Sequence, residues 1–133
     1  MKKISVILML CLLPALSFAQ EKKTPEQREK EFYEAVEKQI ERLTSLLELD
    51  DSQIFYVDSI LTHDYKAMQE ELSALSQAKV ANTDIYYDVQ DKWSEQIYNS
   101  LQGVFDESQW NKYLKAGAAR DKKARDKRAA KKK

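Results

Sequence analysis

The sequence is poor in the residues that support disulfides, tight turns and metal sites. Its 133 residues include one cysteine, one histidine, two glycines and two prolines. Cys11 falls inside the predicted signal peptide described below, so we expect the mature chain to have no thiol, disulfide or cysteine metal ligand. So few glycines and prolines, together with 33% charged residues, argue against a β fold and favour long helices. Two glycines are also too few for a phosphate-binding loop.

Residues 1–19 have the three parts of a secretory signal peptide. Lys2 and Lys3 form the positive region, residues 4–13 form an apolar run, and Ser17-Phe18-Ala19 places small residues at a cleavage site. The apolar run is too short to span a membrane. We therefore expect an exported, soluble product that begins at Gln20.

The net charge of zero conceals an uneven distribution. Residues 21–114 carry 20 acidic and 10 basic side chains, a net charge of −10, whereas residues 115–133 carry 10 basic and 2 acidic side chains, a net charge of +8. No apolar side chain larger than alanine follows residue 117. We therefore expect one helical domain over residues 20–117 and a basic, disordered tail over residues 118–133.

Apolar residues at helical spacing predict an all-α fold of about four helices. Thr24 is a good N-cap for the first helix, with Pro25 at its first position. The second and third helices form a long helical hairpin, flanked by the first helix and a short last one. This arrangement is compatible with a bundle or with an open, curved dimer. The four segments cover about residues 25–48, 50–76, 83–103 and 106–117.

The sequence offers no candidate catalytic, cofactor-binding or metal-binding residues. His63, the single histidine, lies opposite the apolar stripe of its helix, so we expect it to be solvated. Most carboxylates fall on predicted polar faces, and no positioned partner for a general base is evident. One histidine with scattered carboxylates also lacks the ligand spacing of a transition-metal site. We therefore expect a protein that is not an enzyme.

Four aromatic residues point away from the main apolar stripes of the two long helices. Such side chains bury a second seam, against the first helix or a dimer partner, or they form a surface that binds other proteins. Both interpretations predict a surface that is apolar in the isolated monomer. These candidate protein-binding residues are Phe55, Tyr56, Tyr87 and Tyr98.

A five-residue pattern occurs twice, each time immediately before an apolar-periodic segment. The copies are residues 49–53 (LDDSQ) and residues 105–109 (FDESQ). In each copy the aspartate can act as N-cap and the glutamine can complete a capping box, so we expect Asp50 and Asp106 to cap helices. Because capping alone favours Asp-x-x-Gln, two independently capped helices would produce the same pattern.

The two copies resemble the L-T-x-x-Q motif of the Spy/CpxP family of small periplasmic helical proteins. In that family two such motifs open helices on either side of a long helical hairpin in a curved fold. Asp50 and Asp106 stand where the family has threonine, and Phe105 stands where it has leucine. The resemblance implies structural importance for Leu49, Gln53, Phe105 and Gln109.

The resemblance also implies a function in envelope stress. Such a protein would bind unfolded exported proteins in the periplasm without ATP or cofactor, as a homodimer, or would dampen a sensor kinase. The alternative is an envelope adaptor or regulator whose basic tail binds an anionic surface or a sensor partner. A tail that only solubilises the chain or screens its acidic body is a further possibility. Nucleic acid is not an expected partner of an exported protein.

Overall fold

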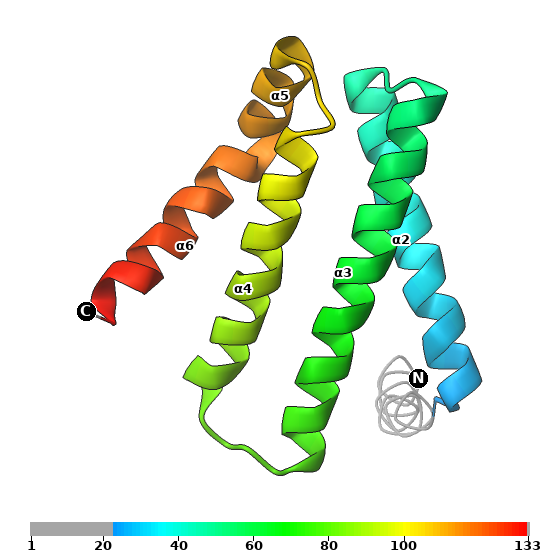
Figure 1. Ribbon diagram of the computed structural model, residues 1–133. Coiled ribbons are helices and arrows are strands. Elements are labelled where there is room, and N and C mark those ends of the chain that lie inside the picture. The colour runs from blue at the N-terminus through cyan, green and yellow to red at the C-terminus, as the bar shows by residue number, and fades with distance from the viewer. Residues whose placement is uncertain (1–22, 133) are drawn as a thin grey trace, which may run out of the picture. The chain divides into compact units, whose positions relative to one another are not determined.

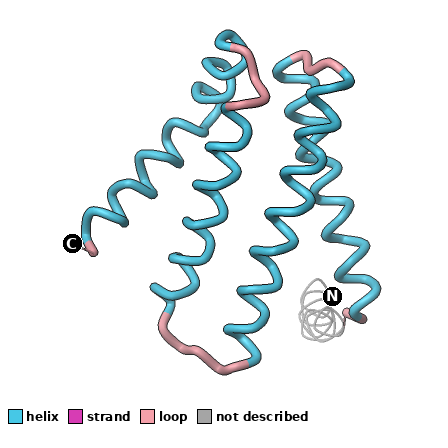
Figure 2. The backbone as a smooth tube through the Cα atoms, in the orientation of Figure 1, coloured by secondary structure: helices cyan, strands magenta, loops and turns pink. Residues whose placement is uncertain are grey.

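The computed structural model describes residues 23–132, and nearly all of them are helical. Figure 1 and Figure 2 show helices joined by short connections. The predicted all-α fold is confirmed, since no strand occurs in the described residues. The predicted signal peptide, residues 1–19, lies outside them. The elements are α2 (Pro25–Leu47), α3 (Asp51–Gln77), α4 (Thr83–Gln102), α5 (Glu107–Tyr113), the π-helical segment η1 (Leu114–Ala118) and α6 (Ala119–Lys131).

The chain divides into two compact units, and the division falls within α2, between Glu34 and Ala35. The described part of the first unit contains the predicted helix start. Thr24 Oγ1 accepts a hydrogen bond from the Gln27 amide at 3.2 Å, and Gln27 Oε1 accepts one from the Thr24 amide at 3.1 Å. These two bonds satisfy amides that the first turn of a helix otherwise leaves unpaired. All features described below belong to the second unit.

The core of the second unit lies where α3 begins and α4 ends. These helices form the predicted antiparallel hairpin and pack side by side (Figure 1). Within the described residues, the buried apolar side chains are confined to the first half of α3, the second half of α4, the adjoining part of α2 and the two repeat copies. Completely covered side chains are the ones whose truncation costs most. The buried apolar residues are Val36, Leu43, Leu47, Leu49, Val57, Leu61, Ile97, Leu101 and Phe105.

Two helices end on residues with left-handed backbone conformation that are not glycine. Glu48 follows α2 with φ of 54°, and Lys79 follows α3 with φ of 57°. The amide after each of them donates back into the last turn, from Leu49 to the Thr44 carbonyl at 3.2 Å and from Val80 to the Leu75 carbonyl at 3.0 Å. This is the usual way in which a left-handed residue satisfies the last carbonyls of a helix.

The expectation of a disordered basic tail is wrong for residues 118–132, because residues 119–131 form helix α6. Gly117 has φ of 139° and ψ of −18°, a conformation open essentially only to glycine, and it interrupts the regular helix at η1. After this kink the chain runs back beside α4 (Figure 1). The sequence prediction considered only apolar burial, whereas α6 is held by ion pairs to α4.

Candidate functional site

The two repeat copies meet through their glutamine side chains. Gln53 Nε2 donates to Gln109 Oε1 at 2.7 Å, and Gln109 Nε2 donates to Gln53 Oε1 at 3.1 Å. This reciprocal pair joins the first turns of α3 and α5 across 56 residues of sequence. The repeat is therefore one structural feature in which two helix starts hold each other.

Each glutamine also binds the backbone on both sides of the pair. Within each copy Oε1 accepts from the capping aspartate's amide, at 3.1 Å from Asp50 and 3.0 Å from Asp106. Each Nε2 donates its second proton to a backbone carbonyl of the other side, Gln53 to Val104 at 3.1 Å and Gln109 to Leu47 at 3.2 Å. Every donor and acceptor position of both amide groups is thus occupied.

The remaining repeat residues behave as the sequence suggests. The carboxylates of Asp50 and Asp106 each accept from the amide three residues on, at 2.8 Å, so both capping boxes are complete. Leu49 and Phe105, the first residues of the copies, are buried in the core. The ring of Phe105 lies 5.5 Å from that of Tyr113, which ties the second copy to the end of α5.

The candidate aromatics separate into different environments. Phe55 and Tyr56, one turn into α3, are 66% and 54% exposed, with their rings edge to face at 5.6 Å. Tyr87 on α4 is also exposed, and the Arg128 guanidinium lies 6.0 Å from its ring. Tyr98 is half-buried in a seam within the chain. The structure therefore does not gather the four candidates into one surface.

The seam around Tyr98 lies between α4, α5 and α6. Its ring meets that of Trp110 at 4.9 Å in an edge-to-face contact. On α6, Lys122 Nζ and Arg125 Cζ lie 5.8 and 5.5 Å from the Tyr98 ring centroid. Such cation–aromatic contacts strengthen as the site becomes less hydrated. Tyr98 therefore helps to hold α6 and is less exposed than Phe55, Tyr56 and Tyr87.

A row of ion pairs joins the basic side chains of α6 to the acidic side chains of α4. Glu95 accepts from Lys122 at 2.6 Å and from Arg125 at 3.0 Å. Asp91 receives both Nε and Nη2 of Arg128, at 2.7 and 2.8 Å, in a forked geometry. Lys132 and Asp88 continue the row. The tail thus neutralises carboxylates of its own chain.

The pKa values of these groups shift in the directions that pairing requires. Burial alone would raise the pKa of Glu95, but hydrogen bonds from Lys122 and Arg125 outweigh it and hold the pKa below its ordinary value. Hydrogen bonds from Asp126 and then Glu95 raise the pKa of Lys122. The bond from Asp91 raises the pKa of Arg128.

The single histidine is exposed, as expected, but it contacts a buried carboxylate that the sequence analysis missed. Asp64 accepts from Gln96 Nε2 at 3.1 Å and lies 2.7 Å from Nδ1 of His63. Its position could have been inferred, because Asp64 follows Val57 and Leu61 at helical spacing along the buried stripe. An acid on that stripe needs a partner, which α4 supplies through Gln96.

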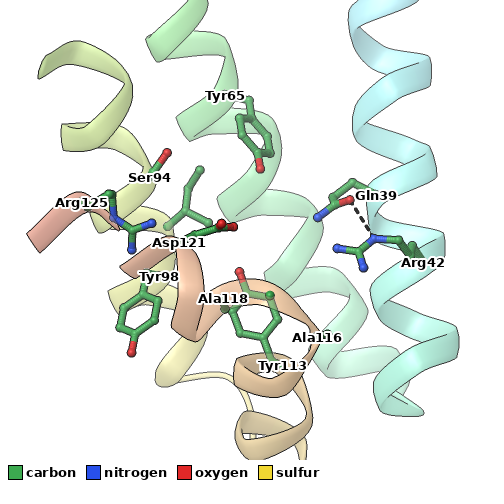
Figure 3. A pocket seen from close by; sticks show the side chains of 12 residues that line it. Gln39, Arg42, Tyr65, Ser94, Tyr98, Tyr113, Ala116, Ala118, Asp121 and Arg125 are labelled. Carbon is green, nitrogen blue, oxygen red and sulfur yellow. Dashed lines mark hydrogen bonds between the residues drawn. The ribbon is translucent and has the colours of Figure 1, made fainter. Parts of the chain in front are cut away.

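A pocket of about 160 Å³, not predicted from the sequence, is lined by residues of α2, α3, α4, α5, η1 and α6 (Figure 3). Arg42 and Arg125 lie on opposite sides of it, with the hydroxyls of Tyr65 and Tyr113 between them (Figure 3). Burial and the nearby Tyr65 raise the pKa of Tyr113 to about 12. Its phenol is therefore a neutral hydrogen-bonding group at pH 7.

Arg125 is the unusual member of this pocket. Only 9% of its side chain is exposed, and its Nε is engaged by Glu95. Its Nη2 is buried with no hydrogen-bond partner in the described residues. An unsatisfied buried donor typically costs about 1–3 kcal/mol, and more when the group is charged. This site could not be predicted from the sequence, because its residues come from six separate elements.

Other recognisable sites are absent from the described range. No group of three or more histidine, cysteine or acidic side chains is arranged to hold a metal ion within residues 23–132. None of the helices in this range is both long and apolar enough to cross a membrane.

Comparison with known proteins identifies no relative: no family model, curated protein or solved structure matches this chain. The resemblance to the Spy/CpxP family therefore rests on the two repeat copies.

Proposed function

We propose that this protein is a non-enzymatic, periplasmic chaperone-like protein that binds unfolded exported polypeptides without ATP, in the manner implied by its resemblance to the Spy/CpxP family. The observation that carries the proposal is the exposure of Phe55 and Tyr56. Two adjacent, mostly exposed aromatic rings provide an apolar surface that a soluble monomer usually covers unless it binds something.

The chemistry around the pair favours a particular kind of client. Asp51 and Asp58 lie four residues before and three after Phe55, on the same face of α3, and both are exposed. Carboxylates beside aromatic rings attract segments that carry basic side chains among apolar ones. Unfolded polypeptides expose such mixed segments, which a folded protein would bury.

The hydrogen bonds between the two repeat copies fix the start of α3, where Phe55 and Tyr56 lie. Phe55 and Tyr56 follow the capping box of α3, whose Gln53 is tied to α5. Side chains presented from a fixed helix start lose less conformational entropy on binding than side chains on a mobile loop. Binding by surface burial alone is reversible, so a client could be held and released without ATP.

The first test is suppression of aggregation by the chain that begins at Gln20, with a chemically unfolded client and no ATP, at low and moderate salt. We expect suppression near stoichiometric ratios. Replacing Phe55 and Tyr56 together with serine should raise the concentration needed by about tenfold or more, because aromatic anchors commonly dominate binding energy. The measurement is light scattering against protein concentration.

Ile85→Ser is the matched control, since Ile85 is an exposed apolar residue on another helix. Its effect should be within about twofold of the unchanged protein. Equal loss in the control and the double variant, or no suppression at any ratio, would remove the proposal. The competing interpretation is that a second copy of the chain covers the aromatic pair. Sedimentation of the double variant tests it: loss of a dimer together with unchanged suppression would assign the aromatic pair to self-association.

The alternative function, an adaptor that binds an anionic envelope surface through α6, has an observation in its favour. Lys123, Lys127 and Lys131 are exposed and take no part in the ion pairs with α4. Each lysine near an anionic membrane contributes about 1 kcal/mol. If the adaptor function is real, replacing all three with glutamine should abolish salt-sensitive binding to anionic phospholipid vesicles. If it is not, the triple variant should bind unfolded clients as well as the unchanged protein does.

A further inference from the structure

The pocket beside α6 has an excess of hydrogen-bond donors over acceptors. Arg42 and Arg125 contribute two positive charges, and Tyr65, Tyr113 and Ser94 contribute hydroxyls; the one carboxylate in the lining is Asp121. Arg42 Nε donates to Gln39 Oε1 at 3.1 Å, which fixes the guanidinium at the side of the pocket (Figure 3). Such a lining attracts an anion.

The decisive feature is the state of Arg125. Its side chain is nine-tenths buried, Glu95 engages only Nε, and Nη2 has no partner in the described residues. Figure 3 shows its guanidinium at the pocket, across from Arg42. A buried charged donor facing a cavity favours an acceptor brought by a ligand, because it is otherwise unsatisfied.

The apolar part of the lining restricts what that ligand can be. Ile97 is buried, and the rings of Tyr65, Tyr98 and Tyr113 surround the cavity. A cavity of about 150 Å³ accommodates a molecule of about benzene size, and this one measures about 160 Å³. Guanidinium groups match the planar geometry of a carboxylate. We propose that this pocket binds a small organic carboxylate, with its carboxylate on Arg125 and its apolar body among the tyrosine rings.

Asp121 restricts the charge of the anion that the pocket is expected to bind. Its carboxylate lines the same pocket, yet it makes no ion pair with Arg125, and its ion pair is with Arg120 at 3.8 Å. A carboxylate at this place repels a multiply charged anion more than a singly charged one. The site should therefore prefer a monocarboxylate to phosphate. This inference goes beyond the proposed client binding and does not depend on it.

The test is calorimetric titration of the purified protein with benzoate, benzamide and inorganic phosphate. Benzoate and benzamide share a ring and differ in charge at the group that would meet Arg125. We expect benzoate to bind with a dissociation constant of about 1 mM or tighter, and benzamide and phosphate to bind at least about tenfold more weakly. Equal binding of benzoate and benzamide, stronger binding of phosphate, or no binding of benzoate would overturn the proposal.

Variants locate the site. Arg125→Lys keeps a positive charge near Glu95 but cannot supply the second guanidinium nitrogen, so benzoate affinity should fall by about tenfold. Arg42→Gln changes an exposed residue outside the ion-pair row and should lower affinity several-fold even if Arg125→Lys proves unstable. Lys123→Gln, which changes an exposed lysine of α6 outside the pocket lining, is the control and should leave affinity unchanged. Undiminished benzoate binding in Arg42→Gln and Arg125→Lys would refute the assignment.

Discussion

Replacing Gln109 with alanine should lower the free energy of unfolding by about 2–4 kcal/mol, because four hydrogen bonds are lost at once. Its amide oxygen accepts from Asp106 and Gln53, and its amide nitrogen donates to Leu47 and Gln53. The change leaves the part-buried Leu47 carbonyl of α2 without this donor and removes two of the four hydrogen bonds of the Gln53 side chain. Urea denaturation followed by circular dichroism measures the effect.

A double-mutant cycle with Gln53→Ala decides whether the two repeats act together. The two side chains exchange reciprocal hydrogen bonds at 2.7 and 3.1 Å, so their coupling energy should be about 1–2 kcal/mol. Additive effects within about 0.3–0.5 kcal/mol would mean that two independently capped helices are enough to explain the pattern. Gln69→Ala, an exposed glutamine of α3, is the control and should change stability by less than about 0.5 kcal/mol.

The local parts of this structure could be predicted from sequence because the residues that decide them are adjacent. Asp50 and Gln53 form a capping box within one turn, and the helices begin close to the predicted residues. The bonds between Gln53 and Gln109 could not be predicted, because they depend on how the hairpin brings residues 56 positions apart together. The pattern indicated that the glutamines matter but not that they meet.

The prediction for the tail failed for a different physical reason. Apolar content is a sound guide to burial, and α6 has no apolar side chain larger than alanine. Apolar content does not report charge complementarity between helices. Acidic residues 88, 91 and 95 of α4 face basic residues of the C-terminal segment once Gly117 turns the chain. The same turn creates the pocket at Arg125. Charge patterns on two separate helices become informative only when their packing is known.

Replacing Glu95 with alanine should release α6 from α4. Arg125 would then be a nine-tenths buried guanidinium without its carboxylate, and breaking a buried pair from one side is strongly destabilising. Since Glu95 is about one-third exposed and Arg125 can turn outward, the cost is reduced. We expect the free energy of local opening of α6 to fall by about 2–3 kcal/mol. Amide hydrogen exchange over residues 119–131 should accelerate by about 30- to 150-fold.

Acid should have the same effect without a mutation. The pKa of Glu95 is lowered in the folded protein, so its stabilising contribution is complete above its ordinary value of 4.5 and is lost as the pH falls through the folded value. The protection of the α6 amides, judged from the exchange rate relative to the intrinsic rate at the same pH, should therefore fall below pH 4.5 in the unchanged protein, whereas Glu95→Ala should lack this component. Glu70→Ala, which removes an exposed glutamate of α3, should leave α6 protected. Slow exchange in α6 of the Glu95 variant at neutral pH would show that packing around Tyr98, rather than the ion pairs, holds the helix in place.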